Sequence, residues 1–203
     1  MFKFEPKMTS EKIISAARKL FEQKGYDQTS VRDIATLADV NVALINYHFE
    51  SKENLFFAIL EESMDMTRMK LTSINDSGDS ADEKLRKVVA MYVEKIFDHC
   101  QYFHFVQREL ENPTRQKLRE HIARVVGKNN KELKNFIEGA QASKEFRKEV
   151  DVDLIIATMF GILHQTTHEF ISKRYRKPGE KDDAFRARVE KYLYQLLLQQ
   201  LKK

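Results

Sequence analysis

The scarcity of residues that favour tight turns is the feature that most constrains the fold of this chain. Only six glycines and three prolines occur among its 203 residues. Sheets built from many short strands need more turn residues of this kind. Lysine, glutamate, leucine, alanine, arginine and glutamine, which are good helix formers, are plentiful instead. We therefore predict an all-α fold, and the length suggests one compact domain with a small additional module.

Composition and cysteine content narrow the class of protein. With 42% hydrophobic and 33% charged residues, the chain has apolar material for a core and charge for solubility. The single cysteine, Cys100, excludes an internal disulfide and a multi-cysteine zinc site. The first six residues carry charges where a signal peptide needs an apolar stretch, so the cytoplasm is the expected compartment. The most apolar segment, Leu154 to His168, is too short to span a membrane and is interpreted as a buried helix.

An amphipathic helix is expected near the start of the chain. Thr9 or Ser10 is the expected N-cap, and Gly25 is placed to end the helix as a C′ residue. One face of the 3.6-residue period between them is apolar. Its residues are Ile13, Ile14, Ala17, Leu20 and Phe21.

Two short helices follow, separated by a very tight turn. Ser30 with Asp33 three residues later resembles a capping box, and the helix that it begins stops near Asp39. Asn41 is placed to cap the next helix, which we expect over Val42–His48. Two short helices joined in this way form a helix-turn-helix. The interior residues of this motif are expected to be Ile34, Ala35, Ala38, Val40 and Ile45.

The remainder of the chain is predicted to form further helices, with breaks at residues 76–80 and 177–180. Ser51 is placed to cap the first of them. The expected ranges are 52–75, 82–98, 101–111, 114–140, 152–175 and 183–201. We predict a helix-turn-helix DNA-binding domain over residues 1–51 and a helical ligand-binding and dimerisation domain over residues 52–203.

The second helix of the motif has one face that points away from the core. At 100° per residue, Ala43 and Tyr47 fall at about 160° and 200° from Ile45, and Asn46 and Leu44 fall at about 100° and 260°. In the major groove of DNA, Asn46 suits an adenine edge, and Ala43 and Leu44 suit thymine methyl groups. Tyr47 suits a phosphate. These contacts predict an operator rich in A·T pairs.

Contacts with the phosphate backbone must come from the flanks of this helix, because no lysine or arginine lies between Val40 and Phe49. A lysine at the start of a helix, such as Lys52, opposes the macrodipole unless a phosphate sits there. The net charge of +4 permits a polyanionic partner. The predicted DNA contacts are Thr29, Ser30, Arg32, Asn41, Val42, Ala43, Leu44, Asn46, Tyr47, His48 and Lys52, with Lys3 and Lys7 as further phosphate contacts.

The order and spacing of these residues resemble the amino-terminal domain of TetR-family transcriptional regulators. The similarity covers roughly residues 10–60 and rests on the runs Thr29–Ala35, Val40–Phe49 and Ser51–Leu55. The resemblance implies a homodimeric all-α repressor that binds a palindromic operator on double-stranded DNA and is released by a small-molecule effector. Two positions depart from the family pattern: Asp39 stands where many members have glycine, and Asn46 where many have tyrosine.

Aromatic residues of the larger domain are candidates for the effector pocket. Their chemistry suits an apolar or aromatic molecule with one polar handle. Filling of the core is the alternative role for each of them. The candidates are Phe97, Tyr102, Phe103, Phe105, Phe160 and His164.

A second subunit is expected to cover part of the larger domain. The segment 154–171 is apolar around its full circumference and needs cover on every side. A two-fold dimer would also supply the two reading helices that a palindromic operator requires. The predicted interface residues are Ile156, Met159, Leu163, Thr167, Phe170, Leu193, Leu196 and Leu197.

The sequence offers little support for metal or enzyme chemistry. His164 and His168 are one helical turn apart, but no third ligand at fixed spacing accompanies them, so we predict no metal and no cofactor. The alternative function is a helical enzyme with a His/Glu site in the C-terminal bundle. Because no converging nucleophile, acid and base can be assembled, we favour the regulator and expect no membrane partner.

Overall fold

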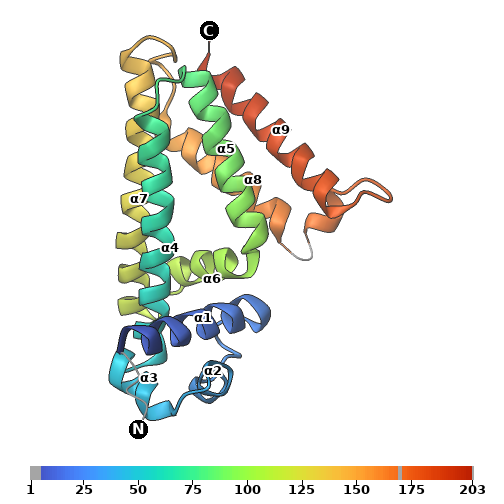
Figure 1. The fold of residues 1–203 in the computed structure, drawn as a ribbon. Coiled ribbons are helices and arrows are strands. Elements are labelled where there is room, and N and C mark those ends of the chain that lie inside the picture. Colours follow the sequence, from blue (N-terminus) through green and yellow to red (C-terminus); the bar gives the residue numbers. More distant parts are fainter. Residues whose placement is uncertain (1–5, 169–170, 203) are drawn as a thin grey trace. The chain divides into compact units, whose positions relative to one another are not determined.

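The chain is helical throughout the part that the structure describes. This computed structural model describes residues 6–168 and 171–202, and within them the regular elements are α-helices and one short 3-10 helix, which confirms the all-α prediction. No described helix is long and apolar enough to cross a membrane. The elements in Figure 1 are α1 (Pro6–Lys24), α2 (Val31–Ala38), α3 (Val42–Phe49), α4 (Lys52–Asn75), α5 (Ala81–Asp98), α6 (Cys100–Glu111), α7 (Gln116–Ala142), α8 (Val152–Thr167), η1 (Ser172–Arg174) and α9 (Asp182–Leu201).

The chain divides into two compact units. The first extends to Asp65 and includes Gln101–Val126, and the second comprises Met66–Cys100 and the residues from Gly127 onward. Helices α4 and α7 therefore contribute residues to both units. The boundary between the DNA-binding domain and the ligand-binding and dimerisation domain, expected after residue 51, stays a prediction. The boundaries of the compact units lie at other positions.

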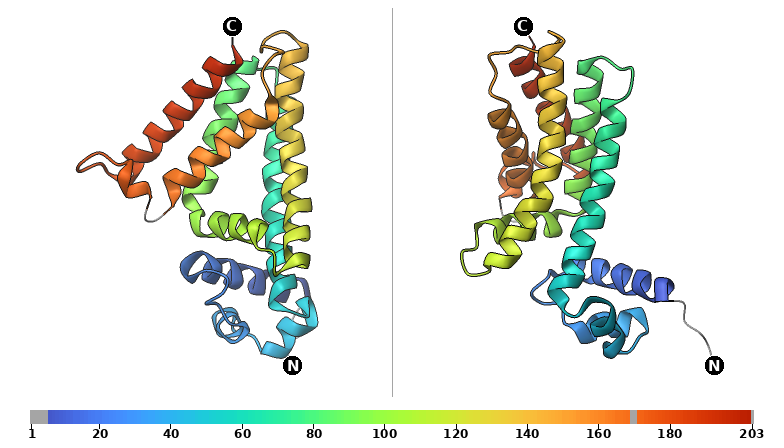
Figure 2. Two further views of the ribbon diagram at one scale, coloured as in Figure 1. Left: turned by 180° about the vertical axis from the view of Figure 1, so that it is seen from behind. Right: turned by 90° about the vertical axis from the view of Figure 1, so that its left-hand side faces the viewer.

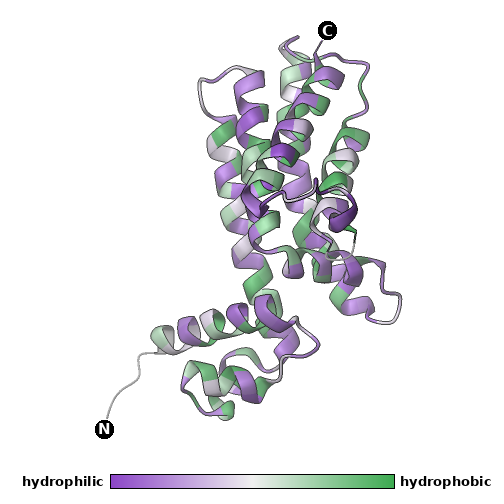
Figure 3. Cartoon of the chain, turned by 90° about the vertical axis from the view of Figure 1, so that its right-hand side faces the viewer, coloured by the Kyte–Doolittle hydropathy of each residue, from purple (hydrophilic) through white to green (hydrophobic). Residues whose placement is uncertain are grey.

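The first unit is built around helices α1, α2 and α3. Helix α1 packs against both of the others, as Figure 1 shows. Its ribbon alternates between hydrophobic and hydrophilic residues in Figure 3, and Ile13 and Ala17 on the apolar side are fully buried. The helix begins at Pro6, so Thr9 and Ser10 lie inside it and the predicted N-cap is wrong. The predicted end is confirmed: Gly25 has φ +79° and donates its amide to the Phe21 carbonyl at 3.0 Å.

An aromatic cluster fills the interior of the first unit. Phe56 of α4 is fully buried, and its ring centroid lies 6.0 Å from that of Phe21 and 5.3 Å from that of Tyr26. Two rings of α6 pack on it as well, with centroids 5.4 Å (Tyr102) and 4.9 Å (Phe105) away. Tilted and edge-on ring pairs at these distances are favourable. This packing holds α1, α4 and α6 together behind the helix-turn-helix.

The second unit is built on helix α5. Figures 1 and 2 show α9 lying beside α5 and α8, and the same three helices contact one another. Ser80 caps α5, and its hydroxyl and the Glu83 carboxylate form a reciprocal capping box. Helix α8 ends at Thr167, before the predicted end near residue 175, and the chain continues into η1. The buried stripe of α5 is Leu85, Val88, Val89, Tyr92, Val93 and Ile96.

Candidate nucleic-acid interface

The start of α2 is held by the predicted capping box. The Asp33 amide donates to the Ser30 hydroxyl at 3.1 Å, and the Ser30 amide donates to the Asp33 carboxylate at 2.9 Å. The Lys24 ammonium also donates to the Asp33 carboxylate, at 2.9 Å, and so ties the end of α1 to α2. Reciprocal bonds of this kind satisfy amides that a helix start leaves unpaired.

This cap makes the motif sensitive to acid. The hydrogen bond from the Ser30 amide, followed by the contact with Lys24, lowers the pKa of Asp33 from 3.8 to about 2. The stabilisation is thus fully present above the unfolded pKa and is lost as the pH falls through about 2. We expect Asp33→Asn to lower the melting temperature at neutral pH by an amount that shrinks between about pH 4 and pH 2. Thermal denaturation of Asp183→Asn, an exposed carboxylate in the first turn of α9, is the control; a difference that persists at pH 2 would contradict this role.

The turn between α2 and α3 is closed by backbone hydrogen bonds. Asp39 adopts the left-handed conformation, with φ 52° and ψ 51°, and its amide donates to the carbonyls of Ala35 and Thr36. Asparagine and aspartate tolerate this region better than most residues, which explains how aspartate replaces the glycine found in many TetR-family members. Asn41 then caps α3 by accepting a 2.9 Å hydrogen bond from the Ala43 amide. The predicted caps of the motif are confirmed.

Helix α3 presents the predicted outward face. Ile45 is fully buried, whereas Tyr47 is 79% exposed and Leu44 is 37% exposed. Ala43 and Asn46 are also exposed. Helix α3 therefore packs on the rest of the chain through the side that carries Ile45. The opposite side is exposed and can enter a groove of DNA.

Lys52 has a role within the chain that the sequence does not reveal. Its ammonium donates to the carbonyls of Tyr26 and Thr29, each at 3.0 Å, and lies 4.1 Å from the centre of the Tyr26 ring. Burial lowers its pKa. The carbonyls of the turn before α2 stabilise the cation at the start of α4, so Lys52 positions the helix-turn-helix within the chain. Its contact with a phosphate stays a prediction.

The remaining predicted contacts differ in accessibility. Ser30 and Arg32 are exposed, and Val42 and His48 are half-buried. Thr29 is only 1% exposed, and its hydroxyl donates to the Gly25 carbonyl at 2.8 Å, so this side chain stabilises the turn. Lys3 and the side chain of Lys7 lie outside the described part of the chain.

An ion-pair network that the sequence did not reveal braces the turn before α2. The Asp27 carboxylate accepts hydrogen bonds from Arg108 of α6 at 2.7 Å and from Arg115 at 3.3 Å. Arg115 also donates to Glu109 at 3.4 Å, and Glu109 is only 1% exposed. A buried carboxylate needs such partners. No local pattern could have predicted the two pairs of Asp27, because 81 and 88 residues separate their members.

The six predicted pocket residues divide between the two units. Tyr102, Phe103 and Phe105 belong to the first unit, whereas Phe97, Phe160 and His164 belong to the second. The closeness in sequence of Phe97 to the three aromatic residues of α6 is a poor guide to their position, because the chain passes from one unit to the other after Cys100. In the second unit Phe160 packs edge-on against Tyr92, with ring centroids 5.2 Å apart. Contact of any of these residues with an effector stays a prediction.

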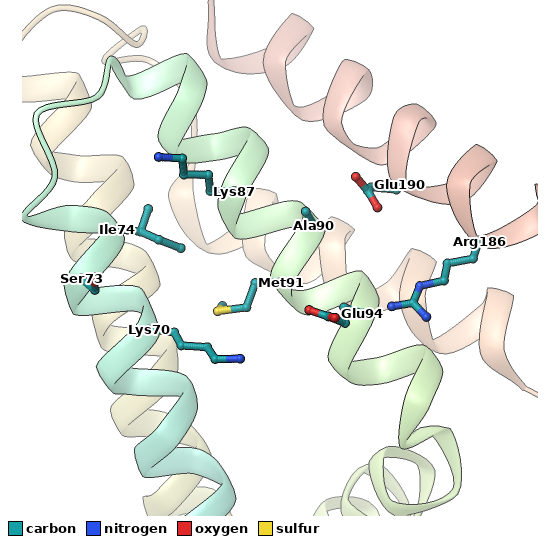
Figure 4. Close-up of a pocket in the computed structure, with 9 residues that line it drawn as sticks. All are labelled: Lys70, Ser73, Ile74, Lys87, Ala90, Met91, Glu94, Arg186 and Glu190. Carbon is teal, nitrogen blue, oxygen red and sulfur yellow. The ribbon is translucent and has the colours of Figure 1, made fainter. Parts of the chain in front are cut away.

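A separate cavity of about 630 Å³ lies among α4, α5 and α9 of the second unit. Figure 4 shows side chains from all three helices around it. None of the six predicted pocket residues lines this cavity. Its lining consists of Lys70, Ser73, Ile74, Lys87, Ala90, Met91, Glu94, Arg186 and Glu190.

Most of the predicted dimer residues are buried within a single chain, which contradicts their assignment to a subunit interface. Ile156, Met159 and Leu163 of α8 are 7%, 2% and 0% exposed. Leu193 and Leu197 of α9 are 0% and 1% exposed. The physical reason is that these residues form the face on which α8 and α9 pack against each other and on α5. Thr167 and Leu196 are half-buried, and Phe170 lies outside the described residues.

His164 lies in α8, and His168 is the residue that follows the end of this helix. The ring centroids of His164 and His168 are 6.1 Å apart. Among the described residues, no group of three or more histidine, cysteine, aspartate or glutamate side chains could hold a metal ion.

Comparison with known proteins places the chain among bacterial regulators. A family described as "Bacterial regulatory proteins, tetR family" matches residues 13–59, and one described as "Tetracyclin repressor-like, C-terminal domain" matches residues 78–170. Together these regions make up more than half of the chain. The chain belongs to the TetR family of transcriptional regulators.

Individual relatives agree with this assignment. The "Probable HTH-type transcriptional regulator YttP" of Bacillus subtilis is 38% identical over 50% of this chain and 50% of its own length. The repressor NicS of Pseudomonas putida is 28% identical over 81% of this chain and 79% of its own. The solved fatty acid degradation regulator FadR of Bacillus halodurans is 26% identical, with a TM-score of 0.76 and 97% of each chain covered. The matched part spans half or less of the first curated relatives. These relatives are regulators, so the enzyme alternative is not supported.

Proposed function

We propose that this protein is a DNA-binding transcriptional repressor that binds a palindromic operator as a homodimer and is released by a small apolar molecule. The exposed face of α3, opposite fully buried Ile45, is the observation that supports this most directly. Because the α2–α3 turn is closed by hydrogen bonds at both caps, this face is held in a defined orientation. The proposed partner, chromosomal DNA, also makes the cytoplasm the proposed location.

The proposed DNA contacts combine base edges with phosphates. Asn46 is placed for an adenine edge, and Ala43 and Leu44 for thymine methyl groups. Tyr47 and the exposed Arg32 are placed for phosphates. Ser30, Asn41, Val42 and His48 surround this surface as further candidates.

Selection of bound sequences from a random duplex pool tests this proposal. We expect an A·T-rich palindrome with two half-sites about one helical turn, or a multiple of it, apart. Because α3 itself has no lysine or arginine, the affinity should depend only moderately on salt. Recovery of no enriched sequence would contradict the proposal.

The outward face of α8 supports a homodimer. Leu154 is 65% exposed, and Ala157, Thr158, Gly161 and Gln165 are exposed along the same stripe. The Thr158 hydroxyl donates to the Leu154 carbonyl at 2.8 Å, which leaves its methyl group for contact with a partner. No atom lies within 4 Å of a Cβ added at Gly161, so packing within the chain does not require glycine there. Glycine within a helix is destabilising, and close approach of a second helix would offset that cost.

A buried tyrosine supports a polar handle on the effector, that is, a hydrogen-bonding group on an otherwise apolar molecule. Tyr92 of α5 is 5% exposed, and its hydroxyl has no hydrogen-bond partner among the described residues. A buried hydroxyl without a partner costs about 1–3 kcal/mol, and a ligand acceptor would recover part of that energy. Fatty acids are the first class to screen, because one solved relative is named as a fatty acid degradation regulator.

Replacement of Tyr92 by phenylalanine tests this handle. Without ligand, we expect the melting temperature to stay unchanged or to rise by a few degrees, because the variant loses only an unpaired hydroxyl. The stabilisation of the protein by oleate, and the oleate-induced loss of operator binding, should both weaken. Differential scanning fluorimetry and fluorescence anisotropy measure these effects.

Tyr194→Phe is the matched control. The Tyr194 hydroxyl donates to Asp82 and accepts a 3.0 Å hydrogen bond from Arg86, so its removal should lower the melting temperature. If Tyr92→Phe destabilised the ligand-free protein as much as Tyr194→Phe does, the Tyr92 hydroxyl would have a protein partner and the proposed handle would be wrong.

A further inference from the structure

The open cavity among α4, α5 and α9 has the size of a small-molecule site and a lining that combines apolar and charged side chains. Its volume of about 630 Å³ falls within the range of small-molecule sites. Figure 4 shows Lys70 and Ile74 on the α4 side, Met91 and Glu94 on α5, and Arg186 on the α9 side. The cavity therefore extends across α5 from one neighbouring helix to the other.

The apolar part of the lining follows from the spacing of residues on α5. Ala90 lies four residues before Glu94 and three after Lys87, so a methyl group stands between two long side chains on one face. The short side chain leaves space above the helix. Ile74 and Met91 continue this apolar surface, and methionine adapts its shape to a ligand.

The charged part of the lining consists of three cations and two carboxylates, and both carboxylates lack a partner among the described residues. Lys87 is paired with Asp79, and Arg186 is paired with Asp98 at 2.8 Å, so carboxylates outside the lining neutralise these two cations. Within the described chain, neither Glu94 nor Glu190 forms an ion pair or a hydrogen bond. Two negative charges beside an apolar surface favour a cationic ligand.

Lys70 is the one cation of the lining that has no such partner among the described residues. In Figure 4 it lies on the α4 side, whereas Glu190 lies on the α9 side. We propose that this cavity binds an organic cation with an apolar body, whose charge lies near Glu94 and Glu190 and whose body contacts Ile74, Ala90 and Met91. The site is independent of the DNA-binding proposal, because it requires neither DNA nor a dimer.

Tetraphenylphosphonium and tetraphenylborate are suitable probes because they have nearly the same shape and opposite charges. Isothermal titration of the full-length protein should give a dissociation constant on the order of 100 µM for the cation and much weaker binding of the anion. The double variant Glu94→Gln/Glu190→Gln should weaken binding of the cation about tenfold, and this difference should decrease at high salt. Lys70→Met should strengthen binding two- to threefold, because it removes a repulsive charge.

Two further variants separate charge from shape. Glu132→Gln/Glu138→Gln, on α7 and outside the lining, is the matched control and should leave binding unchanged. Ala90→Leu fills the space above α5 and should weaken binding of the cation about tenfold without loss of helicity. The proposal is overturned if the phosphonium fails to bind at millimolar concentration, if the borate binds as tightly, or if the Glu94 and Glu190 variant binds as the wild type does.

Discussion

Replacement of Tyr47 by alanine is expected to abolish operator binding while the fold stays intact. The Tyr47 side chain is 79% exposed and lies on the face of α3 opposite Ile45. Its removal should therefore change the free energy of unfolding by less than about 0.5 kcal/mol. In a dimer the substitution removes one phosphate contact from each half-site, so we expect the affinity to fall at least about 100-fold.

Fluorescence anisotropy with the selected operator measures this loss, and thermal denaturation checks the fold. Tyr175→Ala is the control, because Tyr175 is also an exposed tyrosine, at 46%, but lies in the loop after η1. Operator binding by Tyr175→Ala should match that of the wild type. Unchanged affinity in Tyr47→Ala would rule out α3 as the reading helix.

The helix-turn-helix could be predicted because its determinants are local. The Ser30–Asp33 capping box and the Asn41 cap each involve residues two or three positions apart. The burial of Ile45 and the exposure of Tyr47 follow from the 100° spacing of residues along a helix. Such features depend little on distant parts of the chain.

Features that depend on tertiary contacts could not be predicted. The sequence predicts a phosphate contact for Lys52 because its own helix gives no reason for a cation at that position. The carbonyls that bind it belong to Tyr26 and Thr29, more than 20 residues earlier. Asp27 and Arg108, which pair across 81 residues of sequence, are a second example. In each case the partner is known only once the helices are packed.

The side of α8 that packs within the chain could not be predicted from the sequence either. Periodicity showed that the helix is apolar on most sides but not which side packs within the chain. Ile156, Met159 and Leu163 face the interior, and the outward stripe consists of smaller or more polar residues. Because small residues give a weak hydrophobic signal, periodicity alone predicts the larger side chains at the subunit interface, whereas they pack within the chain.

A negative charge on this outward stripe should prevent dimerisation. We expect Gly161→Glu to be monomeric, because a carboxylate would be buried without a partner between two subunits. The variant should fold, since there is space for a Cβ at Gly161 and glutamate is a better helix former than glycine. Sedimentation velocity should show the molecular mass halved. Operator affinity should fall by about 100-fold or more, because a monomer engages only one half-site.

Gly139→Glu is the matched control for this experiment. Gly139 is an exposed glycine within α7, and a Cβ added there also meets no atom within 4 Å. The two variants therefore make the same change of residue and charge in a helix, and they differ only in the surface that receives it. We expect Gly139→Glu to remain a dimer with wild-type operator affinity. If both variants were dimers, the subunits would associate through a surface other than the outward stripe of α8; if both were monomers, the effect would come from charge alone.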